Sequence, residues 1–181
     1  GRRHRSAVWP VHQRFHGAGD EAIAKHQQGH WETAEKLYQS LLAEDVNNSD
    51  ILHLMGILYG QIGQFAAAKE YLERALVIAP NSATFHNSMA NINKHLKDIE
   101  GAVAHYKIAM QLDPASTTAY TNLAILMTRE GNLTQAGENA EKALALNPND
   151  PEAHYTLAVI ALKQNNPSLA TILPDKSTFS P

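Results

Sequence analysis

The chain contains no cysteine. Disulfide bonds and thiolate metal sites are therefore excluded, and the redox environment of the protein is left open. No apolar run approaches ~18 residues, the length that a membrane-spanning helix needs. The sequence also lacks a glycine-rich phosphate-binding loop and a Glu-x-x-His zinc motif. These absences favour a soluble protein without an evident nucleotide-dependent or zinc-dependent chemistry.

Charge is distributed unevenly along the chain. The net charge is −3, yet the first sixteen residues carry Arg2, Arg3, Arg5 and Arg14 and no acid, so the remainder carries −7. An acidic body disfavours polyanions, and we expect no nucleic-acid partner. For the basic arm, taken as residues 1–14, three interpretations stay open. It contacts nucleic acid or a membrane, it is an Arg-rich targeting remnant, or, as we favour, it is a solvated tail or cloning residue.

One alanine recurs at a spacing of 34 residues: Ala34, Ala68, Ala102, Ala136 and Ala170. Its surroundings recur as well. Small residues stand twelve positions before it, at Ala22, Gly56, Ala90, Ala124 and Ala158. Twelve positions after it stand Val46, Pro80, Pro114 and Pro148, followed two positions later by Asn48, Ser82, Ser116 and Asp150. The chain therefore contains an internal repeat of 34 residues, and repeats of this length are typical of solenoid proteins.

Each repeat has the pattern of two short helices. Apolar residues at helical spacing predict helices over residues 83–96 and 99–112, and the other copies follow the same scheme. The proline cannot continue the second helix, and the Asn, Ser or Asp that follows is a good N-cap for the next one. Stacking of copies would bury the apolar face that one pair of helices leaves open.

The residues of segment 49–82 resemble the tetratricopeptide repeat family. The matching residues are Leu52, Met55, Gly56, Tyr59, Gly63, Phe65, Ala68, Leu72, Ala75 and Pro80. Units 83–116 and 117–150 match nearly as well, except at Lys97, where glycine is usual, and Ala140, where a large side chain is usual. The resemblance implies an all-α fold, a right-handed superhelical solenoid of antiparallel helix pairs. It covers residues 15–173 as one array of about five units, followed by a tail over residues 174–181.

The two ends of the array depart from the family pattern. Unit 15–48 has Glu21 at a core place and Val46 for proline, so we expect its first helix to be short or displaced. The fifth unit, 151–173, is cut short by Pro174, which leaves Ile160, Leu162 and Leu169 without a following unit to cover them. Two alternatives follow: residues 174–181 fold back as a cap, or the natural protein continues. An uncovered terminal unit would also be a surface for self-association.

The resemblance implies a function for the first helix of each unit, because in this family those helices line a concave groove that binds a protein or an extended peptide. Places are counted here from the first residue of each unit, and the groove residues are at places 2, 5, 6, 9, 12 and 13. The peptide-binding residues that this assignment predicts are His53, Ile57, Gln61, Asn87, Asn91, Lys94, His95, Thr121, Asn122, Ile125, Arg129, Tyr155 and Lys163.

Asn91 and Asn122 stand where clamp-type members of the family hold a peptide backbone and its carboxylate. An amide both donates and accepts, so it suits a peptide unit, although these asparagines serve equally well to hydrate a polar groove. The clamp's cations are missing, and Glu152 replaces one of them, which argues against a chaperone-tail carboxylate. Lys94, Arg129 and Lys163 form a weaker basic strip that favours an acidic peptide.

Enzymatic and metal sites are weakly indicated. His26 and His30 lie four residues apart, as do His12 and His16, but no third zinc ligand accompanies either pair, and we interpret them as exposed histidines. His86 and His154 occupy a packing place, which predicts partly buried structural histidines. We therefore expect no cofactor, no metal and no catalysis by this chain. We expect it to act as a scaffold or adaptor in the cytoplasm. Residues 26–76 also resemble the opening repeats of bacterial glycosyl-, sulfo- and methyltransferases, so the alternative is the substrate-recognition arm of such an enzyme.

Overall fold

The computed structural model describes residues 17–165, and the regular structure in that range is entirely α-helical. The helices are α1 (Ala18–Gln27), α2 (Trp31–Glu44), α3 (Ser49–Gln61), α4 (Phe65–Ile78), α5 (Ala83–His95), α6 (Ile99–Leu112), α7 (Thr117–Arg129), α8 (Leu133–Leu146) and α9 (Pro151–Asn165). The predicted all-α class is confirmed. The helices expected over 83–96 and 99–112 are α5 and α6, so the period and the terminating prolines locate the helices almost to the residue.

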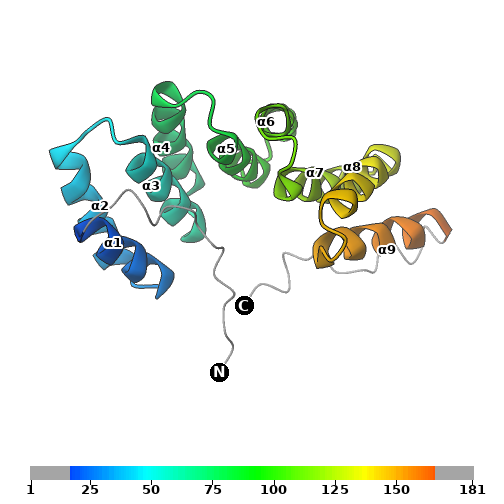
Figure 1. The fold of residues 1–181 in the computed structure, drawn as a ribbon, viewed down its shortest axis with the longest axis horizontal. Coiled ribbons are helices and arrows are strands. Elements are labelled where there is room, and N and C mark those ends of the chain that lie inside the picture. The colour runs from blue at the N-terminus through cyan, green and yellow to red at the C-terminus, as the bar shows by residue number, and fades with distance from the viewer. Residues whose placement is uncertain (1–16, 166–181) are drawn as a thin grey trace. The chain divides into compact units, whose positions relative to one another are not determined.

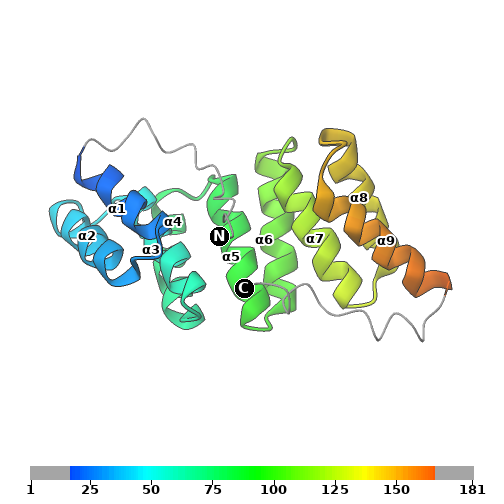
Figure 2. The same ribbon diagram turned by 90° about the horizontal axis from the view of Figure 1, so that it is seen from below.

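The chain forms two compact units that divide between Leu96 and Lys97. In the first, α1 packs against α2, α3 against α4, and α5 against α4 (Figure 1). In the second, α6, α7, α8 and α9 lie side by side in chain order (Figure 2), and α9 contacts both α8 and α7. In both units the core therefore lies between consecutive helices, as the repeat predicts.

The recurring small residues permit close helix packing. Ala34, Ala68, Ala102 and Ala136 are fully buried, while Ala170 lies outside the described residues. Gly56 shows how close the packing is, because a Cβ added there would lie 2.7 Å from Cγ of Leu72 and 3.2 Å from the carbonyl oxygen of Ala68. Only glycine fits that contact without displacing a neighbour.

Larger side chains fill the space beside the small ones. In the first unit the main cluster joins Tyr38 of α2 to Met55 and Leu58 of α3, all fully buried, and a second cluster joins Leu72 of α4 to Met89 of α5. Burying each such side chain contributes about 1.5–3 kcal/mol. Because each cluster spans two successive pairs, a single repeat would leave part of its apolar face exposed.

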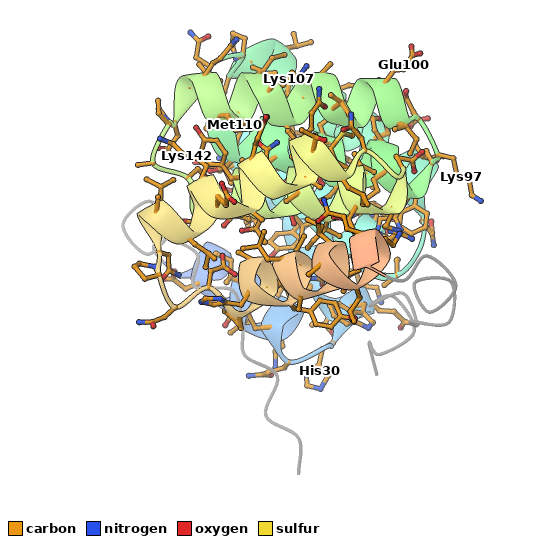
Figure 3. All side chains as sticks on the ribbon, turned by 90° about the vertical axis from the view of Figure 1, so that its right-hand side faces the viewer. His30, Lys97, Glu100, Lys107, Met110 and Lys142 are labelled. Atoms are coloured by element: carbon orange, nitrogen blue, oxygen red, sulfur yellow. The ribbon has the colours of Figure 1, made fainter. Side chains whose placement is uncertain are left out.

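The turn inside each helix pair uses a left-handed backbone. Gly29, Gly63 and Gly131 have φ of 78°, 79° and 81°, each 34 residues or a multiple of 34 from the next. Lys97 occupies the equivalent position and adopts φ of 62° although it is not glycine. Its side chain points away from the helices (Figure 3), so the backbone conformation is the source of its strain.

Side-chain caps begin most of the helices where the sequence predicts them. The side chains of Asn48, Ser82 and Asp150 accept hydrogen bonds from backbone N–H groups three residues later, at 3.1, 3.3 and 3.0 Å. The prediction for Ser116 was wrong, since that residue precedes α7 but its side chain makes no capping bond. Two second helices are capped as well, by Asp98 and Asn132.

The terminal helices differ from the others. α1 has 10 residues against 13 in α3, so the expected short first helix is confirmed, and Glu21 is exposed. At the other end, the prediction that Ile160 is uncovered was wrong, because its side chain is 5% exposed. α9 turns Ile160 toward its own neighbours, whereas Leu162 is 43% exposed. Leu169 and residues 174–181 lie outside the described range.

Candidate protein-binding surface

The residues predicted to line a groove come from the first helices, which are α3 and α5 in the first unit and α7 and α9 in the second. We call the surfaces that these residues form the first-helix faces. The side chains differ in exposure: Gln61, His95, Arg129 and Tyr155 are exposed, Ile57, Asn87, Asn91, Lys94, Asn122, Ile125 and Lys163 are half-buried, and His53 and Thr121 are buried. Eleven of the thirteen side chains therefore remain accessible, and two lie beneath the surface.

His53 belongs to the packing between α3 and α5. Its side chain is 4% exposed, its Nε2 lies 2.9 Å from Oγ of Ser88, and its ring stacks on Phe85 at 4.4 Å between centroids. Burial lowers the pKa of His53 to about 4, so the imidazole is neutral near pH 7. The pair holds two consecutive first helices in register beneath the face.

His26 connects three helices of the first unit. Its Nδ1 lies 3.0 Å from the hydroxyl of Tyr38 on α2, and its Nε2 lies 2.9 Å from Oε1 of Gln61 on α3. Desolvation lowers the pKa of His26, against an opposing effect of the Gln61 hydrogen bond. The interpretation of His26 and His30 as an exposed pair was wrong for His26, which is 7% exposed because α1 turns it into the junction with α2 and α3.

Two polar links join α7 to α9 in the second unit. The Thr121 hydroxyl donates to Oδ2 of Asp150 at 3.0 Å, while Oδ1 of the same carboxylate caps α9. At the other end, the Lys163 ammonium donates to the Thr128 carbonyl at 3.0 Å. One bond lies near each end of α9, so both its position and its rotation relative to α7 are held.

Three of these links share a spacing that the prediction missed. His26 to Gln61, His53 to Ser88, and Thr128 to Lys163 are each separated by 35 residues, one repeat plus one residue. They connect place 12 to place 13, or place 5 to place 6, of the next unit. Complementary polar residues at this separation are the sequence signal that would have identified them.

Charge is segregated along the first helices. Acidic residues stand in the first turns, with Asp50 on α3 and Glu152 on α9, and basic residues stand in the last turns of α5, α7 and α9. This arrangement matches the helix dipole. From Glu152 to Lys163 the helical rise amounts to about 16 Å. In each unit at least one first helix thus carries a basic residue near its C-terminal end, while α3 carries none there.

The serine and histidine that lie together do not form a usable catalytic pair. Ser88 and His53 are at hydrogen-bond distance, as a nucleophile and its base must be. Both are buried, however, and a histidine with a pKa of about 4 is a weak base at neutral pH. Within residues 17–165 no cluster of three or more His, Asp or Glu side chains is placed to hold a metal ion.

The two histidines predicted to be structural share one role. Nε2 of His86 donates to the carbonyl of Pro80 at 2.9 Å, and Nε2 of His154 donates to the carbonyl of Pro148 at 2.8 Å. Each ring therefore ties the start of a first helix to the proline that ends the preceding repeat. His86 is buried as expected, but His154 is exposed, because it lies on the open side of α9.

Comparisons with known proteins agree with this architecture. The family model described as "Tetratricopeptide repeat" matches residues 25–92 and 127–172. Among solved structures, PilF of Pseudomonas aeruginosa matches with a TM-score of 0.76 at 22% identity, over 85% of this chain and 70% of that one. A crystal structure of MamA matches with a TM-score of 0.73 at 23% identity, over 87% and 90% of the two chains. These identities establish the likeness of fold alone.

Two further proteins are similar to this chain. The first TPR of Spaghetti (RPAP3), bound to an HSP90 peptide, has a TM-score of 0.63 and 22% identity, over 67% of this chain and 97% of that one. An uncharacterized protein, ycf37 of Pyropia yezoensis, is 30% identical over 67 residues, which are 37% of this chain and 38% of the relative. The chain therefore matches well under half the length of that curated relative. Across the described helices, none is long and apolar enough to cross a membrane.

Proposed function

This chain belongs to the tetratricopeptide repeat family, and from that premise we propose that it is a protein-interaction module whose first-helix faces bind an extended peptide segment of a partner protein. The observation that carries the proposal is that most of the predicted residues on α5, α7 and α9 are accessible. They include both polar and aliphatic side chains that are not buried in the core. The likeness in fold to a repeat domain solved with a bound peptide supports it. We propose no catalytic step for these faces.

The chemistry of the faces favours a particular ligand. Ile57, Ile125 and Val159 stand at place 9 of their units and are half-buried, so each offers an aliphatic contact in the middle of its helix. Arg129 and Lys163 stand one turn further on, at place 13. A segment that combines aliphatic and acidic side chains would match both, with its acids near the C-terminal ends of the first helices.

Asn91 on the face of the first unit and Asn122 on the face of the second unit would each contact the backbone of a peptide bound to that face. Both side chains are half-buried, and the Oδ1 of Asn91 accepts a hydrogen bond from the Lys94 ammonium at 3.3 Å. That bond orients the amide, and an amide N–H group is a donor that suits a peptide carbonyl. A peptide hydrogen bond of this kind contributes about 1 kcal/mol net.

Selection from a random peptide library tests the ligand class directly. We would display twelve-residue peptides, enrich for binding to the 181-residue chain, and measure the affinity of the enriched sequences by fluorescence anisotropy. The proposal expects enrichment of Asp and Glu beside Ile, Leu or Val, and affinity that falls as salt rises. Enrichment of basic peptides, or salt-independent binding, would contradict it.

Two variants that each remove one cation locate the contact. Arg129→Ala removes a cation from α7, whereas Lys142→Ala removes one from α8, where the side chain projects outward (Figure 3). We expect the first to weaken binding of an enriched peptide about threefold to tenfold, which is about 1 kcal/mol, and the second to leave it unchanged. Asn91→Ala and Asn122→Ala should each weaken binding about fivefold. Equal affinities for all four variants would place the peptide elsewhere on the molecule.

A further inference from the structure

α1 lacks the large apolar side chains that anchor α3. At places 4 and 7, α3 buries Leu52 and Met55 completely, whereas α1 is exposed at both places. The buried residues of α1 are Gly19, Ala22 and His26. His26 is the one large side chain among them. The attachment of α1 to the first unit therefore depends on a titratable group.

Two hydrogen bonds to different helices hold His26. Its Nδ1 lies 3.0 Å from the Tyr38 hydroxyl of α2, and its Nε2 lies 2.9 Å from Oε1 of Gln61 on α3. An amide oxygen accepts, so Nε2 carries the proton of the neutral ring and Nδ1 accepts from the hydroxyl. A proton added at Nδ1 would make that atom a donor. The Tyr38 hydroxyl, which is fully buried, would then lose its acceptor.

The helices around His26 bring no carboxylate to its ring within residues 17–165. α2 contributes the Tyr38 hydroxyl, while its Glu35 accepts the hydroxyl of a tyrosine on α3. α3 contributes Gln61, which is uncharged. The acids of α1 stand in its first turn, and Lys25 beside His26 is itself a cation. Burial is therefore the main cause that lowers the pKa of His26, and the Gln61 hydrogen bond opposes it.

We propose that α1 is a pH-controlled helix, which detaches from α2 and α3 when His26 takes up a proton while the rest of the first unit stays folded. In the detached state water solvates the imidazole, and its pKa returns to about 6.5. The detached state therefore binds the proton first as pH falls. The ratio of detached to docked molecules increases by up to about tenfold for each pH unit below ~6.5.

Detachment would change the surface of the first unit. Ala34 and Tyr38 of α2, which are fully buried and share a cluster with Ala22, would gain contact with water. Gln61, one of the residues predicted to bind a peptide, would lose its partner on α1. Acidification would thus alter one end of the first-helix face. The detachment itself does not depend on peptide binding, so each proposal is tested without the other.

The absence of cysteine permits a test with single thiols in the 181-residue chain. Ala34→Cys places a thiol where α1 covers α2. Ala68→Cys is the reference, because it is the equivalent position of the next repeat, is fully buried and is covered by α3. Thr33→Cys is exposed and corrects for the fraction of thiolate at each pH. The rate of labelling by iodoacetamide is measured at pH 7.5 and pH 5.5.

We expect the corrected rate for Ala34→Cys to rise about threefold to tenfold from pH 7.5 to pH 5.5. At pH 5.5 it should exceed the rate for Ala68→Cys by about tenfold or more, because local opening costs less free energy than unfolding of the unit. No rise would show that α1 stays docked. Equal rates for the two thiols would show that the whole unit opens together. Either result overturns the proposal.

Two histidine variants identify the titrating group. His26→Gln, added to Ala34→Cys, cannot take up the proton, so labelling should be equally fast at the two pH values, whatever its rate. His30→Gln is the matched control, because His30 lies in the same segment, is exposed and makes no capping hydrogen bond. It should leave the rise unchanged. A rise that persists in His26→Gln would assign the effect to another group and overturn the proposal.

Hydrogen exchange in the unaltered chain gives a second measurement without cysteine. After correction for the intrinsic effect of pH, we expect the protection of the α1 amides to fall about threefold to tenfold from pH 7.5 to pH 5.5. The α3 amides should remain better protected than those of α1 at both pH values. Equal protection of the two helices, or protection of α1 that does not change with pH, would contradict the proposal even if the cysteine variants fold poorly.

Discussion

Gly56 and Gly137 lie in helices of the same family pattern but have opposite surroundings. A Cβ at Gly56 would collide with Leu72, while a Cβ at Gly137 would meet nothing within 4 Å. We expect Gly56→Ala to reduce the free energy of unfolding by about 1–3 kcal/mol through overpacking. Gly137→Ala should raise it by up to about 1 kcal/mol, because alanine is the better helix former. Urea denaturation measures the free energy of unfolding of both variants. A decrease for Gly137→Ala as large as that for Gly56→Ala would contradict the steric explanation.

Among the described turns, Lys97 is the residue that carries a side chain in a left-handed conformation. The three equivalent turns use glycine, which adopts φ near 80° without a Cβ penalty. Lys97→Gly should therefore raise the free energy of unfolding by about 1 kcal/mol, the steric gain exceeding the added entropy of the unfolded chain.

The reverse substitution is the control for the Lys97 prediction. Gly131→Ala introduces a Cβ at φ of 81° in a position with no neighbour within 4 Å, so the backbone conformation alone is tested. We expect it to destabilise the protein by about 1 kcal/mol in thermal or urea denaturation. A stabilising Gly131→Ala would mean that the turn tolerates side chains and that Lys97 is unstrained.

At the scale of the helix, the contact of α3 with α5 depends on a neutral histidine. The pKa of His53 is about 4 in the folded protein and about 6.5 in the unfolded chain. The unfolded state therefore binds the proton first as pH falls, and stability decreases between pH ~6.5 and ~4. The maximum loss from this one group is about 3 kcal/mol. His26, whose pKa is also lowered, adds to the loss in the same direction.

Urea denaturation at pH 7 and pH 5 checks the histidine effect. His53→Gln retains a polar side chain toward Ser88 but cannot take up the proton, so its stability should fall less between the two pH values than that of the unaltered protein. An unaltered pH dependence in His53→Gln would assign the effect to other groups.

Elements were predictable to different degrees. Helix positions followed from the 34-residue period and the prolines, which act locally and recur in register. Ser116 stands at the N-cap of α7 as the repeat predicts, but its side chain makes no capping hydrogen bond, so the pattern gives the position of a cap and not its bond. Ile160 failed because one face of α9 has neighbours and the other does not, and periodicity alone does not say which face carries a given leucine or isoleucine.

At the scale of the whole molecule, family membership followed from the sequence because many places agree across several copies. The candidate site was less predictable. Thirteen residues were nominated by place, yet His53 is buried beside Ser88 on the next first helix, and Thr121 is buried beside Asp150, which caps the next first helix. The His53–Ser88 pairing depends on two variable residues in different repeats. The alternative of a transferase recognition arm stays a prediction, which a catalytic domain encoded in the same reading frame would favour.

The links separated by 35 residues carry a consequence for how the repeats are ordered. His53 requires the serine that the following repeat supplies, and His26 requires the glutamine supplied by the repeat after its own. The packing alanines are the same in every copy, so they would fit against any neighbouring repeat. The polar pairs fit only when the neighbouring repeat supplies the matching side chain. Exchanging two repeats would leave buried imidazoles facing the wrong side chain. The repeats therefore share one shape, and the matched polar pairs between neighbouring repeats fix the order in which they follow one another.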